Sequence, residues 1–313
     1  MHALPLFFAL LLVVEKHNDS VGFYNLADGA PVASVKVGHI PHEFVFSADR
    51  KSVYVTNYGT ARWTDETPGG NTISIIDLAS KKVTGEIDLG RYHRPHGIEL
   101  ARSGKLYVTC DMPSAVLVID PIARKIERVL EAGPKVLPHM LALAHDESRL
   151  YTANAGNGTV SVHDLKAGAS RNIEVGGVPM GLALTKDERT LYAATRTADT
   201  VVEIDTRKWA IRRTFKIEGQ PVRLQLLPGE KQILASLIVD GAMAVIDLKS
   251  GREIKRMKVG INAEGMHIDP QTGEGFISAQ GEKKVVRFSL KDFERKGVVA
   301  TQERPDPILI WRD

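Results

Sequence analysis

Three histidines and two carboxylates stand at one position of a phrase that this chain repeats. In each copy the position follows a proline or its replacement, and in order it holds His42, His96, His139, Met180, Val222, Glu264 and Asp306. Imidazole and carboxylate are the ligands that proteins offer to divalent zinc, iron or copper. If the fold gathers these side chains, the histidines would hold a metal ion, and Glu264 or Asp306 would be the general base.

The same residues also fit an arrangement without a metal. A histidine at such a position can bond the backbone of the neighbouring repeat while it fills the wall of a channel. Clusters of ionisable groups occur in structural networks as well as in active sites. A metal site and a polar ring with a structural or substrate-binding role therefore both stay open.

The phrase itself recurs seven times. The openings lie at residues 41, 95, 138, 179, 221, 263 and 305, with spacings of 54, 43, 41, 42, 42 and 42 residues. Each copy holds four short runs rich in β-branched, aliphatic and aromatic residues, separated by turn residues, which is typical of strands joined by tight turns. No stretch keeps a helical period, so we expect almost no helix. Four antiparallel strands repeated at this period predict the blades of a β-propeller.

Two local signals support this interpretation. The second run carries a Tyr-led phrase, most clearly Tyr54-Val55-Thr56-Asn57, and the third run ends in Asp at positions 77, 120, 164, 205 and 247. Such an Asp bonds the backbone two residues on and fixes the next turn. The Tyr-Val-Thr-Asn phrase resembles the signature of the YVTN-repeat family, over essentially the whole chain. The resemblance implies an all-β, seven-bladed propeller, and the family's frequent export implies a periplasmic or secreted location.

The two ends of the chain predict how the ring closes. The last copy stops after its first run, at residues 305–313, and its three missing strands lie at the N-terminus, within residues 11–37. We expect one propeller domain over residues 1–313, closed by a blade that the termini share. The apolar start, residues 1–14, contains no Lys or Arg, and it is either a shortened signal sequence that runs into a strand or strand alone. It is too short to predict a membrane span.

Further polar side chains are expected at the mouth of the channel, on the ends of second strands, beside the first strands and in the long loop of the first full copy. These candidate ligand-binding residues are Asn57, Trp63, Asp111, Asn154, Arg196, Arg223 and Gln280. The loop, residues 58–71, is a candidate lid, because insertions on one face of a repeat array often mark the binding face. Arg196 and Arg223 suit a carboxylate or phosphate of a ligand, and the alternative is pairing with Glu264, Asp306 or Asp111.

Composition narrows the functions. The chain has 41 Lys and Arg against 38 Asp and Glu, a net charge of +3, and no aromatic stacking stripe, so nucleic acid is an unlikely partner. One cysteine rules out an internal disulfide, and no nucleophile elbow, phosphate-binding glycine loop or haem attachment motif occurs. We expect a monomeric propeller that binds a small molecule or a protein at its top face. The alternative is a metal-dependent hydrolase, lactonase or lyase, so whether the chain is an enzyme stays open.

Overall fold

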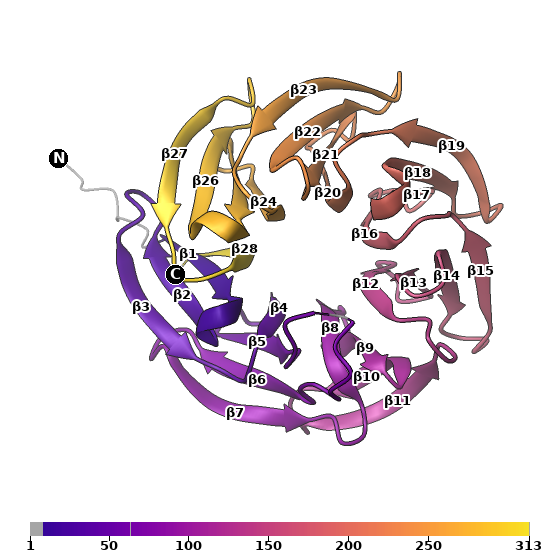
Figure 1. Cartoon of the computed structure of the whole chain (residues 1–313). Coiled ribbons are helices and arrows are strands. Elements are labelled where there is room, and N and C mark those ends of the chain that lie inside the picture. Colours follow the sequence, from indigo (N-terminus) through magenta and orange to yellow (C-terminus); the bar gives the residue numbers. More distant parts are fainter. Residues whose placement is uncertain (1–8, 63, 313) are drawn as a thin grey trace.

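The computed structural model describes residues 9–62 and 64–312 and has the form of a closed ring of seven four-stranded antiparallel sheets (Figure 1). This confirms the predicted seven-bladed propeller. Helix in the described residues is limited to three short 3-10 segments, Lys16–Asn18, Arg196–Ala198 and Gln280–Glu282. No described helix is long and apolar enough to cross a membrane.

Each blade runs from an innermost strand at the centre of the ring to an outermost strand at its rim. Blade 1 comprises β4 (Pro41–Phe46), β5 (Ser52–Asn57), β6 (Thr72–Asp77) and β7 (Lys82–Asp88). Blade 2 comprises β8 (His93–Leu100), β9 (Leu106–Met112), β10 (Ser114–Asp120) and β11 (Lys125–Glu131). Blade 3 comprises β12 (Pro138–Leu143), β13 (Arg149–Asn154), β14 (Thr159–Asp164) and β15 (Ser170–Glu174). Blade 4 comprises β16 (Pro179–Leu184), β17 (Thr190–Thr195), β18 (Thr200–Asp205) and β19 (Ala210–Lys216). Blade 5 comprises β20 (Pro221–Leu226), β21 (Gln232–Leu237), β22 (Ala242–Asp247) and β23 (Arg252–Lys258). Blade 6 comprises β24 (Ala263–Asp269), β25 (Glu274–Ala279), β26 (Lys284–Ser289) and β27 (Arg295–Ala300).

Blade 7 joins the two ends of the chain, as predicted. Its strand order is β28 (Pro305–Arg312), β1 (Ala9–Glu15), β2 (Ser20–Asn25) and β3 (Pro31–Lys36). The C-terminal strand pairs antiparallel with the N-terminal one, with Leu10 opposite Trp311 and Leu12 opposite Leu309. The ring therefore has no open inner edge between its first and last blades.

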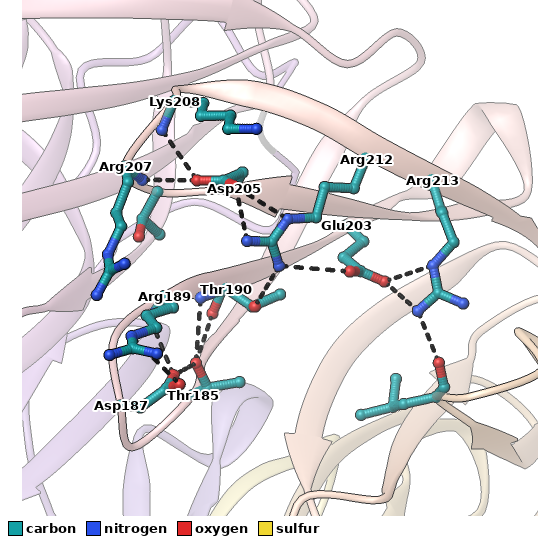
Figure 2. Close-up of polar contacts among 12 residues, drawn as sticks. Thr185, Asp187, Arg189, Thr190, Glu203, Asp205, Arg207, Lys208, Arg212 and Arg213 are labelled. Carbon is teal, nitrogen blue, oxygen red and sulfur yellow. Dashed lines mark hydrogen bonds and ion pairs between the residues drawn. The ribbon is translucent and has the colours of Figure 1, made fainter.

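The turns after the third strands follow the predicted Asp pattern. In blade 4, Oδ1 of Asp205 accepts hydrogen bonds from the backbone N–H groups of Arg207 and Lys208, both at 2.9 Å (Figure 2). Asp77, Asp120, Asp164 and Asp247 accept backbone N–H groups two or three residues on in the same way. A short polar side chain thus sets the path from the third to the fourth strand in five blades.

The hydrophobic core lies between neighbouring blades. Ile73 and Ile87 of blade 1, for example, are fully buried in one cluster with Leu106 and Leu117 of blade 2. Burial of such a side chain stabilises the fold by roughly 1.5–3 kcal/mol. Because every blade packs on two neighbours, the start of each innermost strand is held at a fixed place around the axis of the ring.

Candidate functional site

The three predicted histidines lie side by side at the starts of β4, β8 and β12. The ring centroids of His42 and His96 are 3.8 Å apart, those of His96 and His139 are also 3.8 Å apart, and those of His42 and His139 are 6.5 Å apart. His96 is therefore the middle member of the row. The repeat alignment predicted this order, because equivalent positions of a rotational repeat lie on one circle.

The histidines line a cavity of about 480 Å³. The position that follows the opening residue of each repeat contributes His42, His96, His139, Met180 and Glu264 to its wall. A second set of side chains comes from six of the seven blades, at the end of the second strand or directly after it. This second set consists of Lys16, Tyr58, Asp111, Ala155, Arg196 and Ile238.

The histidines are neutral at pH 7. Burial lowers the pKa of His42 and His96 well below the ordinary value, and the neighbouring imidazoles, Lys16 and Arg223 act in the same direction. Burial and Arg223 lower the pKa of His139 to about 3, although a hydrogen bond to the Met180 carbonyl opposes them. Neutral imidazole is the form that can bind a metal ion or accept a hydrogen bond from a ligand.

The neighbours of the imidazoles fix which nitrogens are free. Lys16 Nζ donates to His42 Nε2 at 2.9 Å, so Nδ1 of His42 carries the proton, toward Glu43 Oε1 at 3.3 Å. His139 Nδ1 donates to the Met180 carbonyl at 3.2 Å, so the lone pair of its Nε2 can accept a hydrogen bond or bind a metal ion. His96 is only 3% exposed, and its Nδ1 has no partner among the described residues.

Replacement of His139 by Gln is expected to change how stability depends on pH. The pKa of His139 is about 3 in the folded protein, against 6.5 for an ordinary histidine. The unfolded chain therefore binds more protons below pH 6.5, and the stability of the native protein falls as the pH drops toward 3. Between pH 7 and pH 5, protonation of His139 in the unfolded chain lowers the free energy of unfolding by about 2 kcal/mol.

Urea denaturation of the native protein and of His139→Gln at both pH values measures this difference. The variant should gain about 2 kcal/mol relative to the native protein on acidification. The exposed His39, replaced in the same way, serves as the control and should show a much smaller change. If the difference in stability between His139→Gln and the native protein is the same at both pH values, His139 is protonated in the folded protein at pH 5.

A buried group of charges lies next to the row of histidines. Arg223, from β20, is 8% exposed and pairs with Glu43 of β4, on the far side of the ring, and its Nη2 lies 3.6 Å from Asp306 Oδ1. Burial lowers the pKa of Arg223, but the carboxylates of Glu43, Asp306 and Glu264 outweigh it and raise the pKa above the ordinary value. Arg223 is thus held by protein carboxylates, of which Asp306 was among the partners that the sequence suggested and Glu43 was not.

The two candidate bases occupy different places. Glu264 lines the cavity, and its Oε2 accepts a hydrogen bond from Gln280 Nε2 at 2.6 Å. Burial and the neighbouring Asp306 raise the pKa of Glu264. Asp306 is fully buried, pairs with Lys16 and does not contribute to the lining of the cavity. Of the two, Glu264 is the carboxylate that a bound molecule could touch.

The structure brings some of the predicted second-strand residues to the cavity and turns others away. Asp111 and Arg196 line it. Asn57 and Asn154 are the last residues of β5 and β13, and their amides bond Thr and Ser side chains inside their own blades. The side chains of a strand alternate between its faces, so in these blades the next residue, Tyr58 or Ala155, reaches the cavity.

Sequence reasoning missed Lys16, Tyr58 and Glu43. Lys16 and Tyr58 directly follow second strands, so a consistent alignment of the residue after that strand would have found them. Glu43 directly follows His42 and had no repeat partner of its own type.

The long loop of blade 1 lies against the cavity. Thr60, Ala61, Arg62 and Thr64 contribute to the lining. Arg94 holds the loop from β8, because it donates to the backbone carbonyls of Asp65, Thr67 and Pro68. Trp63, the predicted aromatic contact, lies outside the described residues.

One group of side chains has a spacing that suits a metal ion. Ligand atoms of His42, Glu43 and His96 lie within 4.8 Å of one another. Glu43 is already paired with Arg223. The group differs from the predicted set, in which His139 was the third ligand.

Comparisons with known proteins show the fold. No family model and no curated protein matches the chain, so membership of the YVTN-repeat family is not confirmed. A functionally unknown protein from Desulfotomaculum acetoxidans aligns with a TM-score of 0.78 and 14% identity, over 96% of this chain and 98% of that chain. The periplasmic gluconolactonase of Pseudomonas aeruginosa aligns with a TM-score of 0.75 and 17% identity, over 96% and 99%. The dihydro-heme d1 dehydrogenase NirN aligns with a TM-score of 0.71 and 14% identity, over 99% and 76%.

Proposed function

We propose that this propeller binds a small anionic molecule, a carboxylate, in the cavity beside the three histidines. The observation that carries the proposal is the charge of the lining. Four cationic side chains, Lys16, Arg62, Arg196 and Arg304, face two carboxylates, Asp111 and Glu264. Lys16 is paired with Asp306 behind the wall of the cavity, and the other three cations still outnumber the two carboxylates. The lining therefore favours a negatively charged occupant.

Two of the arginines have hydrogen-bond donors to spare. Arg196 uses only Nε, which donates to Gln220 Oε1 at 2.9 Å, and its terminal nitrogens have no partner among the described residues. The guanidinium of Arg62 likewise has no partner in the described part of the chain. A guanidinium with free donors binds a carboxylate with two parallel hydrogen bonds.

Titration calorimetry with two six-carbon acids, hexanoate and gluconate, tests the proposal. We expect at least one of them to bind, and Arg196→Gln to weaken that binding at least tenfold, because a charge-assisted pair is lost. The matched control is Arg207→Gln, an exposed arginine of the same blade that does not line the cavity. Absence of binding by both acids, or equal affinities for Arg196→Gln and the native protein, would contradict the proposal.

A metal-dependent hydrolase, lactonase or lyase is the second candidate function. The observation that favours it is the buried imidazole of His96, which lies between two other histidines and has a free Nδ1. Once Lys16 releases His42 Nε2, the imidazoles of His42 and His96 with either Glu43 or His139 would hold a divalent zinc, iron or copper ion. Such an ion polarises a carbonyl or acidifies its bound water, and Glu264 could then act as the base.

Titration with Zn²⁺ tests this second candidate. Replacement of His96 by Gln should weaken zinc binding at least a hundredfold, because the middle ligand is lost. The exposed His39, replaced in the same way, is the control. Zinc binding that is absent from the native protein, or equal in His96→Gln, would leave anion binding as the only function proposed.

We also propose an exported location, periplasmic or secreted. The resemblance to a family that is often exported supports it, as does the description of one structural neighbour as a periplasmic protein. Detection of the protein in the periplasmic or culture fraction of its own cells would test it.

A further inference from the structure

Asp111 has one carboxylate oxygen in use and one free. Asp111 lies near the end of β9, is 6% exposed and lines the cavity. Its Oδ2 accepts a hydrogen bond from Tyr58 Oη at 2.6 Å. Its Oδ1 has no partner among the described residues. Oδ1 is therefore the atom with which Asp111 can meet a ligand.

The surroundings of Tyr58 hold this pair in place. Tyr58 is 3% exposed, and its ring contacts those of His42 and His96, with centroids 5.3 and 5.6 Å away. Its hydroxyl proton is committed to Asp111, and Arg94 is committed to the loop carbonyls.

Asp111 is mostly ionised at neutral pH. Burial raises its pKa to about 6, while the hydrogen bond from Tyr58 and the charge of Arg94 hold it down. A carboxylate accepts hydrogen bonds and donates none. Asp111 Oδ1 faces the open space of the cavity, so a bound molecule that brings a hydrogen-bond donor can reach it.

Glu264 repeats this arrangement in blade 6. Gln280 Nε2 donates to its Oε2, and its Oε1 has no partner in the described part of the chain. The cavity thus has two carboxylates, each held by one neutral protein donor and each with one oxygen left over. Two such acceptors beside free arginines specify a molecule with both a negative charge and several donors.

We propose that the ligand is a polyhydroxy acid, whose carboxylate meets Arg196 and Arg62 and whose hydroxyls donate to Asp111 Oδ1 and Glu264 Oε1. The inference rests on the proposed function, since it names the class of anion that the cavity takes. A simple carboxylic acid would leave both acceptors without donors and would place its own charge near theirs. A site built to bond a hydroxyl rejects an analogue that lacks it.

Comparison of gluconate with hexanoate by calorimetry tests the inference. Both are six-carbon monocarboxylates. Gluconate carries a hydroxyl on each carbon except the carboxyl carbon, so its hydroxyls can reach an acceptor in several poses. We expect the native protein to bind gluconate at least tenfold more tightly than hexanoate. In Asp111→Asn, Tyr58 Oη can keep donating to the amide oxygen, and the NH2 group then takes the place of the free acceptor. The preference for gluconate should fall at least tenfold. The matched control is Asp292→Asn, an exposed residue of a blade 6 turn.

The outcomes separate the inference from the function on which it rests. Equal affinity for the two acids, or an unchanged preference in Asp111→Asn, would overturn the inference, while hexanoate binding that depends on Arg196 would still support anion binding. Failure of both acids to bind would contradict the proposed function itself. If Asp111→Asn does not fold by circular dichroism, Glu264→Gln makes the same comparison at the second acceptor.

Discussion

A chain that stops at Arg304 is expected to be unfolded at room temperature. The deletion removes β28, the innermost strand of blade 7, with the buried side chains of Ile308, Ile310 and Trp311. Each is worth roughly 1.5–3 kcal/mol. It also removes Asp306 from Lys16, and a buried charge that loses its partner costs several kcal/mol more. These losses together approach or exceed the whole stability of a typical domain, about 5–15 kcal/mol.

Far-UV circular dichroism and a thermal melt measure this effect. A synthetic peptide of residues 305–313, added to the shortened chain, should restore the β signal, because it can pair with β1. The same peptide with Ile310 replaced by Asp is the control and should restore little. A shortened chain that melts like the full-length protein would show that blade 7 does not need its C-terminal strand.

Replacement of Arg223 by Met is expected to destabilise the protein by about 3–5 kcal/mol. Methionine fills similar space, but Glu43 then keeps a buried carboxylate without its partner. Urea denaturation at pH 7 measures the loss.

The control is the double variant Glu43→Gln with Arg223→Met, which removes both charges. It should recover most of the lost stability, because Asp306 keeps Lys16 as a partner. A single variant within about 0.5 kcal/mol of the native protein would mean that the pair contributes little to the fold.

The ring and its closure could be predicted because each depends on a local pattern. Seven openings at a regular spacing define seven blades. The last copy lacks three strands, and the N-terminal residues before the first opening supply them. Asp205 and its equivalents make turns whose donors lie two or three residues away in the chain. The row of three histidines followed from the same periodicity, since rotation places equivalent residues next to each other.

The rest of the site depends on distances that the sequence does not carry. Arg223 reaches Glu43 across the ring, and Lys16 reaches Asp306 from the opposite end of the chain. Asn57 was predicted at the cavity, where Tyr58 lies instead, because one residue decides which side of a strand a side chain takes. Burial, which makes the histidines neutral, likewise appears only in the packed structure.

The shared blade also sets the order in which the protein becomes competent during synthesis. Lys16 leaves the ribosome 290 residues before Asp306, and Arg304 is made just before Asp306. At about 5–20 residues per second, Lys16 waits on the order of 15–60 s for its partner. The binding cavity, which needs both Lys16 and Arg304, therefore cannot be complete before residues from both ends of the ring have been made.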